Sequence, residues 1–171
     1  MFMGPFEQAK PWDMRSIEGV SRFLRRAWTL IVELETVSAA GAGLAGVRHR
    51  TIKKVTEDLE AFAFNTCMSQ LMIYLNAIQD EKTPAKVDLE TLLVLLNPFA
   101  PHLTEELWFR LGNGELLCRR PWPTWDARYL VDSVVEYAVQ VNGKLRATFS
   151  IAADAAEAAV KEAALANEKV K

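Results

Sequence analysis

The sequence predicts a mainly α-helical protein, in which an antiparallel helical bundle is followed by a small α+β lobe with one β-hairpin and one helix. Three observations support this fold class. Apolar residues recur every three or four positions through most of the first 111 residues, as on one face of a helix. Polar or glycine-rich segments separate these stretches. Further on, two alternating stretches flank Asn142-Gly143, which is typical of a β-hairpin.

The first predicted helix covers residues 16–38. Its apolar residues recur at helical spacing, and Ser16 has the kind of side chain that caps a helix N-terminus. Three glycines then follow within six residues, and this density predicts a flexible loop.

A second period runs from Val47 to Ile78 and predicts one helix of roughly thirty residues, about 45 Å long. The segment DEKTPAK ends it, and Asp88 opens the third helix.

The stretch LNPFAPHLTEELW at 96–108 predicts a bend between two helices, and not a catalytic loop. Pro98 has no backbone donor and disfavours a helical conformation at Asn97. Pro101 suits the first turn of a new helix, with Glu105 and Glu106 near its positive end. The bend therefore redirects the apolar face of the chain back into the bundle.

The segment after Leu111 is rich in glycine, proline and tryptophan and has no period, so it is expected to be a connector. The stretches VVEYAVQV and KLRATFSI predict the two strands of the hairpin, and Asp154 is expected to cap an alanine-rich helix after it. We therefore expect two domains: a helical bundle with its connector at 1–126, and a partial C-terminal α+β domain at 127–171.

The composition indicates a globular protein without recognisable catalytic chemistry. Of the 171 residues, half are hydrophobic and a quarter are charged. The two cysteines and two histidines lack the spacing of a metal site or a hydrolytic triad, and no glycine-rich phosphate loop is present. No signal peptide or membrane span is apparent. We expect a soluble, cytoplasmic protein with no catalytic residues, no bound metal and no membrane association.

Basic residues are concentrated in the first third of the chain. The formal net charge is −2, yet residues 1–56 contain nine Lys/Arg and five Asp/Glu. Arg22, Arg25 and Arg26 share one helix stripe by their spacing, and Arg50, Lys53 and Lys54 share another. Taken alone, these stripes are compatible equally with phosphate binding and with an ordinary solvated surface.

Several strings together resemble those of bacterial-type leucyl-tRNA synthetases, a class I family. They are RFLRRAW, KKVTEDLEAFAFNTCMSQLMIYLN, LNPFAPHLTEELW, PWP and VQVNGKLRA, and they occur here in the order of that family. The resemblance covers essentially the whole sequence. It implies an anticodon-binding-type bundle followed by the start of the C-terminal domain. The HIGH and KMSKS motifs of the catalytic domain do not occur in this sequence.

The resemblance also implies a function. The parent enzyme is a leucine–tRNA ligase that uses ATP and Mg²⁺, while this part is expected to hold tRNA(Leu), in cis with the remaining synthetase domains, as a monomer with no cofactor or catalysis of its own. The alternatives are a valyl- or isoleucyl-type bundle and a helical protein-interaction module. The expected tRNA-binding residues are Arg22, Arg25, Arg26, Arg48, His49, Arg50, Lys53 and Lys54 on the bundle, with Lys144 and Arg146 on one face of the hairpin.

Overall fold

The computed structural model describes residues 4, 8–9, 14–34, 36–38, 41, 43–130, 134–141, 144–152, 160–161 and 164. The chain forms two compact units, Met1–Leu130 and Val131–Lys171. From the sequence, residues 127–130 are expected to belong to the second domain. In the structure they belong to the first unit. Their contacts explain this, because the ring of Tyr129 stacks on His49 of the bundle at 4.6 Å between centroids.

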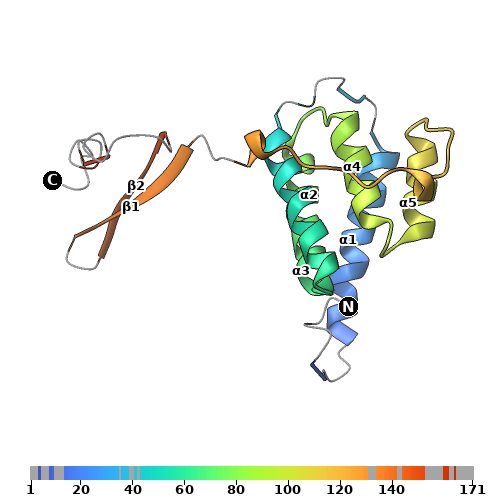
Figure 1. The fold of residues 1–171 in the computed structure, drawn as a ribbon, viewed down its shortest axis with the longest axis horizontal. Coiled ribbons are helices and arrows are strands. Elements are labelled where there is room, and N and C mark those ends of the chain that lie inside the picture. The colour runs from blue at the N-terminus through green and yellow to red at the C-terminus, as the bar shows by residue number, and fades with distance from the viewer. Residues whose placement is uncertain are drawn as a thin grey trace. The chain divides into compact units, whose positions relative to one another are not determined.

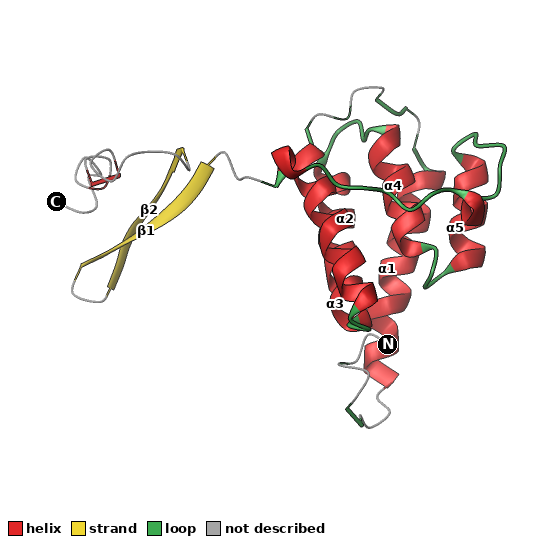
Figure 2. Ribbon diagram, in the orientation of Figure 1, coloured by secondary structure: helices red, strands yellow, loops and turns green. Residues whose placement is uncertain are grey.

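The first unit is a bundle of five helices, which confirms the mainly α fold class (Figures 1 and 2). They are α1 (Met14–Val32), α2 (Ala45–Glu60), α3 (Phe64–Asp80), α4 (Lys86–Leu96) and α5 (Pro101–Arg110). Helix α4 packs against α2, α3 and α5, and its leucines are buried almost all round. A helix that is apolar on every side belongs in the core of a bundle. Helix α1, which packs on α5 and α3, is instead amphipathic and buries only the face of Phe23, Ala27 and Ile31.

Helix α1 is shorter than predicted and begins earlier. It ends at Val32, not near residue 38, and it starts at Met14, so Ser16 lies inside the helix and is not its N-cap. The reason for the early end is a pairing with a distant segment. Ser38 N–H donates to Pro84 O at 2.9 Å, and Lys86 N–H donates to Ser38 O at 3.2 Å. Residues near Ser38 thus form an isolated bridge with the chain that enters α4.

The predicted single helix over residues 47–78 is wrong, because the chain reverses between α2 and α3. At the turn Phe62 has a positive φ of 55°. Ala63 N–H donates to Asp58 O at 2.8 Å, which closes the end of α2. Neither glycine nor proline marks this turn, and both helices have the same apolar period. What favours the break is the packing of α2 along α3, which buries Val55 and Leu71 completely.

The predicted bend after α4 is confirmed, with one correction. Pro101 occupies the first turn of α5, as expected. Asn97, however, keeps a helical conformation with φ −54° and ψ −40°, contrary to the expectation from Pro98. Its N–H donates to Leu93 O at 2.9 Å, and its side-chain Nδ2 donates to Thr104 Oγ1 at 2.9 Å. These bonds outweigh the steric preference that Pro98 imposes.

The connector, residues 111–130, runs from α5 back to α2 (Figure 1). It includes two short 3-10 helices, η1 (Leu117–Arg119) and η2 (Ala127–Tyr129). Trp122 Nε1 donates to Thr56 Oγ1 of α2 at 2.8 Å, and Asp126 N–H donates to His49 Nδ1 at 3.1 Å. A segment without any helical or strand period is therefore fixed to the bundle through one side-chain and one backbone hydrogen bond.

The second unit contains the predicted β-hairpin. Strands β1 (Val134–Val141) and β2 (Lys144–Ala152) pair antiparallel, and the pairing of Val141 with Lys144 leaves a two-residue connection between them. Asn142, Gly143 and the predicted cap Asp154 lie outside the described residues. Of the predicted alanine-rich helix, Val160, Lys161 and Ala164 are described, and all three are helical. None of the helices in the described parts of the chain is long and apolar enough to cross a membrane.

Candidate nucleic-acid interface

The clearest positively charged surface lies on α1. Arg22, Arg25 and Arg26 are exposed, and Arg22 and Arg25 lie on the side of the helix opposite the buried Phe23, Ala27 and Ile31 positions. Among the residues that the structure describes, neither Arg22 nor Arg25 has a hydrogen-bond or ion-pair partner. Their charges are therefore available to an anion, and such a helix face can contact phosphate oxygens without reading a base sequence.

Arg26 differs from its two neighbours because its guanidinium is held by α3. Its Nε donates to Gln79 Oε1 at 3.1 Å, and its Nη2 donates to Asn76 Oδ1 at 2.6 Å and also to Gln79 Oε1. All three side chains lie at the surface. The amides Asn76 and Gln79 were not expected as site residues. In the sequence, Asn76 and Gln79 are marked only by their i, i+3 spacing on the outer face of a helix. A count of charged residues does not include neutral amides and so does not detect them.

Arg48 turns into the bundle instead of facing solvent. Its Nη1 lies 2.8 Å from Asp88 Oδ1 and 3.0 Å from Gly41 O, and 12% of its side chain is exposed. Asp88 also accepts a hydrogen bond from Tyr74 Oη at 2.8 Å. Burial and the neighbouring Asp88 carboxylate raise the pKa of Tyr74, which keeps its hydroxyl protonated as the donor. The charge of Arg48 thus joins α2 to α4 and is neutralised within the protein.

His49 is likewise engaged by the connector. Its ring stacks on Tyr129 with an angle of 6° between the planes, and its Nδ1 accepts the Asp126 N–H. Desolvation lowers the pKa of His49 below 6.5, and the adjacent Arg48 lowers it further, although Asp126 acts in the opposite direction. The neutral ring that results matches its role as a hydrogen-bond acceptor. It contributes little positive charge to an interface near neutral pH.

The remaining α2 cations lie at the surface beside acidic residues of the same helix. Lys54 Nζ lies 2.7 Å from Asp58 Oδ1, and Lys53 Nζ lies 3.8 Å from Glu57 Oε1. The hydrogen bond that Lys54 donates to Asp58 raises the pKa of Lys54. Arg50 is also exposed. Helices α1 and α2 both pack against α3, so the structure places the two basic stripes on helices that have a common neighbour.

Lys144 and Arg146 lie on β2 in the second unit. The expectation that they share one face depends on regular alternation along the strand. The pairing shifts register at this point, since Val139 pairs with Ala147 and Gln140 with Leu145, which leaves Arg146 without a paired residue. A bulge of this kind interrupts the alternation, so their spacing alone does not place them on one face.

The connector adds basic residues that the sequence reasoning did not select. Arg119 and Arg120 are exposed, and the guanidinium of Arg120 lies 5.5 Å from the ring centroid of Trp108. Arg128 instead pairs with Asp126, and their hydrogen bond lowers the pKa of Asp126 to about 2. The signal in the sequence is the pair of adjacent arginines in CRRPW, which lies outside the basic first third of the chain.

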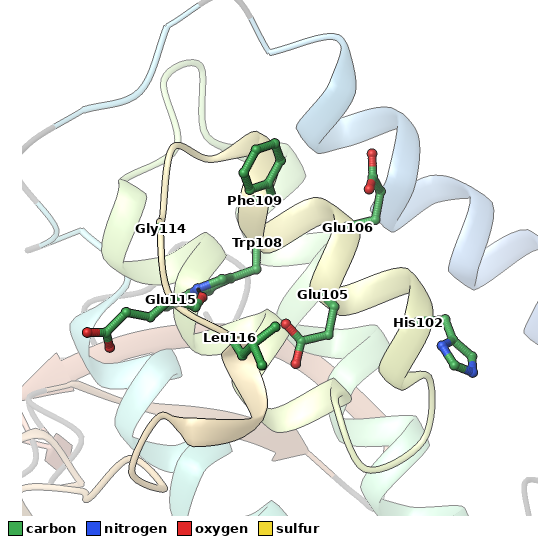
Figure 3. Close-up of a pocket in the computed structure, with 8 residues that line it drawn as sticks. All are labelled: His102, Glu105, Glu106, Trp108, Phe109, Gly114, Glu115 and Leu116. Carbon is green, nitrogen blue, oxygen red and sulfur yellow. Dashed lines mark hydrogen bonds between the residues drawn. The ribbon is translucent and has the colours of Figure 1, made fainter.

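A hollow of about 330 Å³ lies between α5 and the loop that follows it (Figure 3). Three carboxylates and one histidine line it, but the polar contacts of Glu105 and Trp108 are structural. Glu105 accepts the backbone N–H groups of Leu117 and Cys118, both at 2.8 Å, and Trp108 Nε1 donates to Glu115 O at 2.9 Å. Burial alone would raise the pKa of Glu105, but these two N–H groups hold it below its usual range. The hollow is lined by His102, Glu105, Glu106, Trp108, Phe109, Gly114, Glu115 and Leu116.

Comparison with known proteins gives a consistent set of relatives. Residues 44–162 match the family described as the anticodon-binding domain of tRNA ligase. The chain is similar to leucine–tRNA ligase of Chloroherpeton thalassium, with 48% identity over 160 residues that cover 90% of this chain and 20% of the relative. Leucine–tRNA ligase of Chlorobaculum tepidum is 43% identical over 176 residues, covering 99% of this chain and 22% of the relative. The chain spans about a fifth of the length of these curated relatives.

A solved structure with a similar fold is that of Agrobacterium radiobacter K84 agnB2 LeuRS, in a ternary complex described as LeuRS-tRNA-LeuAMS. The TM-score is 0.69 and the sequence identity is 29%. The match covers 99% of this chain and 24% of that chain.

Proposed function

Because this chain belongs to the family of anticodon-binding domains of tRNA ligases, we propose that it is the tRNA-binding part of a leucyl-tRNA synthetase. In this proposal the chain holds tRNA(Leu) in position while other domains of the synthetase, in cis, carry out the ATP-dependent leucylation. The observation that carries the proposal is the exposed arginine stripe Arg22, Arg25 and Arg26 on α1. Its charges are of the kind that position a nucleic acid through its phosphates.

The assignment to leucine is supported by the curated relatives, whose names specify leucine–tRNA ligase. ATP and Mg²⁺ would be bound by the catalytic domains of the parent enzyme. Within the part of the chain that the structure describes, no group of three or more His, Cys, Asp or Glu could hold a metal ion. No chemical step of the reaction is assigned to these residues.

The second unit would belong to a small C-terminal domain, with Lys144 and Arg146 of β2 as a second contact to the tRNA. We further propose that the protein acts as a monomer in the cytoplasm. The monomer is an inference from the bundle, which buries the face of α4 within one chain and so needs no second copy to complete its core.

The proposal is tested by titrating the full 171-residue chain with a tRNA(Leu) transcript at low and moderate salt. The logarithm of the affinity should fall with the logarithm of the salt concentration by about 0.7–0.9 for each phosphate that is neutralised. Reversing three charges in the variant R25E/R26E/K54E should weaken binding and flatten this slope. Unchanged affinity of that variant would contradict the proposed face.

Discrimination among tRNAs is a separate measurement. Unlabelled tRNA(Val) and tRNA(Ile) should compete less effectively than tRNA(Leu) if the leucyl assignment is correct. Equal competition by all three would leave phosphate binding intact but would remove the support for leucine-specific recognition by this part of the synthetase.

A further inference from the structure

The contact between α1 and α3 has an unusual chemical composition. Arg26 is bound by two amides, Asn76 and Gln79, and no carboxylate among the described residues pairs with it. A guanidinium has donors only, so the amide oxygens must be the atoms that face it. The orientation of both amides is thereby fixed, and each must turn its NH₂ group away from Arg26.

The consequence is a surface that offers only hydrogen-bond donors. Both amide oxygens are used by Arg26, and the Nη1 group of Arg26 has no partner among the described residues. The groups left over are Arg26 Nη1, Asn76 Nδ2 and Gln79 Nε2, all of which are N–H donors. An anion with several acceptor oxygens satisfies such a set, whereas a cation or a donor group does not.

The charge of the cluster also distinguishes it from the other basic positions on the bundle. Neutral amides orient the Arg26 guanidinium without cancelling its charge. In contrast, Asp88 neutralises Arg48 at 2.8 Å, and Asp58 lies 2.7 Å from Lys54. Arg26 also loses little side-chain entropy on binding, because it is already held in place. It is therefore both charged and pre-oriented.

We propose that Arg26, Asn76 and Gln79 form a composite binding site for one backbone phosphate of the bound RNA. This inference rests on the proposed tRNA-binding function and assigns the two α3 amides to it. Asn76 and Gln79 both orient Arg26 and donate to the phosphate oxygens. Arg22, one helical turn before Arg26 on α1, continues the same stripe along the RNA backbone.

The competing explanation is that the cluster only ties α1 to α3. The double variant N76D/Q79E separates the two. Each carboxylate keeps an oxygen for Arg26, so the tie is preserved or strengthened. The two outward amide donors are replaced by acceptors, and the charge of Arg26 is cancelled. A purely structural cluster predicts normal RNA binding in this variant, whereas a phosphate site predicts its loss.

The experiment uses the full 171-residue chain and a tRNA(Leu) transcript at several salt concentrations. We expect N76D/Q79E to bind about tenfold more weakly or worse, with a salt slope reduced by about 0.7–0.9 and an unchanged or higher melting temperature. The control is N65D, which makes a single amide-to-acid change on α3 about 16 Å from Asn76 along the helix axis. Its affinity should stay within about twofold of wild type. Wild-type affinity and slope in N76D/Q79E would overturn the proposal.

If the wild-type chain does not bind tRNA, the proposed function is refuted. A second measurement then tests the phosphate site by itself. Inorganic phosphate is then added to the ¹⁵N-labelled chain. The side-chain NH₂ signals of Asn76 and Gln79 should shift, and the shifts should disappear in R26Q, which removes the charge. Absence of the shifts, or equal shifts at Asn65, would reject the phosphate site itself.

Discussion

At the scale of single residues, the bundle uses its charged side chains in two different ways. Arg48 points into the interior and forms an ion pair with Asp88, whose side chain is 2% exposed. Arg22 and Arg25 remain at the surface. The chemical type of the side chain is the same in both cases. The difference arises because Arg48 lies on the side of α2 that packs toward α4, while the α1 arginines lie opposite their helix's apolar face.

The Arg48–Asp88 pair gives the first residue-scale prediction. D88N leaves the Arg48 charge unpaired in a site where it is poorly hydrated, and removing one partner of a buried ion pair costs about 3–5 kcal/mol. The free energy of unfolding, measured by urea denaturation, should fall by about that amount. E106Q is the control, since it breaks the half-exposed Glu106–Arg110 pair and should change stability by about 0.5 kcal/mol or less. Equal, small effects of both substitutions would contradict the structural role of Asp88.

His49 gives a prediction about pH. Its pKa is lowered in the folded protein, first by desolvation, so the unfolded chain binds more protons just below pH 6.5 than the folded chain does. Stability should therefore fall as the pH drops through 6.5, and it should be regained as the pH rises. An NMR titration of the imidazole should give a midpoint below 6.5. A midpoint at or above that value would mean that the ring is not desolvated by Tyr129 and the connector.

At the scale of the elements, the turn between α2 and α3 determines how the helices are arranged. Phe62 adopts a left-handed conformation, and its side chain is 65% exposed. A bulky residue at positive φ is strained, so the packing of the two helices must maintain this conformation. The exposed ring has one edge-to-face contact with Phe64 and cannot itself supply much of the compensation. The stabilisation comes from the apolar residues that α2 and α3 bury against each other.

This turn can be tested by matched substitutions. F62N should keep or slightly raise the stability, because asparagine tolerates the left-handed conformation. F62V places a β-branched residue at the same φ and should lower the free energy of unfolding by about 1–3 kcal/mol. Urea denaturation of both variants measures the difference. If F62V were as stable as F62N, the positive φ at residue 62 would not be a constraint on the fold.

At the scale of the whole molecule, the distribution of charge matters more than its sum. The formal net charge is −2, yet among the described residues the α1 arginines Arg22, Arg25 and Arg26 have no acidic partner. A local basic surface on an acidic protein directs an anionic partner to one face. On α2, by contrast, Lys53 and Lys54 lie beside Glu57 and Asp58, which reduces their attraction for phosphate.

The two stripes are therefore expected to contribute unequally to tRNA binding. R22E/R25E and K53E/K54E introduce the same change in net charge on α1 and on α2. The α1 variant should lose more affinity and more of the salt slope, because the arginines that it replaces have no acidic partner among the described residues. Both are measured by tRNA titration at matched ionic strength. A larger loss in the α2 variant would move the proposed interface to that helix.

The sequence determined the helical class, the bend at LNPFAPH and the hairpin, because each has a local cause: apolar periodicity, proline geometry, or alternation around a two-residue turn. The motif strings also predicted the family. Local patterns did not find the break at Phe62, since the apolar period continues across it. Nor did they find the early end of α1, which depends on the bonds of Ser38 to Pro84 and Lys86.

Tertiary structure alone decided which cations are available at the surface. The resemblance to leucyl-tRNA synthetases placed Arg48 and Arg26 together among the expected tRNA-binding residues of the bundle. In the folded chain Arg48 meets a buried carboxylate brought from α4, while Arg26 meets two neutral amides brought from α3. The partner of a charge is supplied by segments far away in the sequence. A pattern within one helix can predict that a cation is present, but packing determines whether its charge is neutralised or left for a ligand.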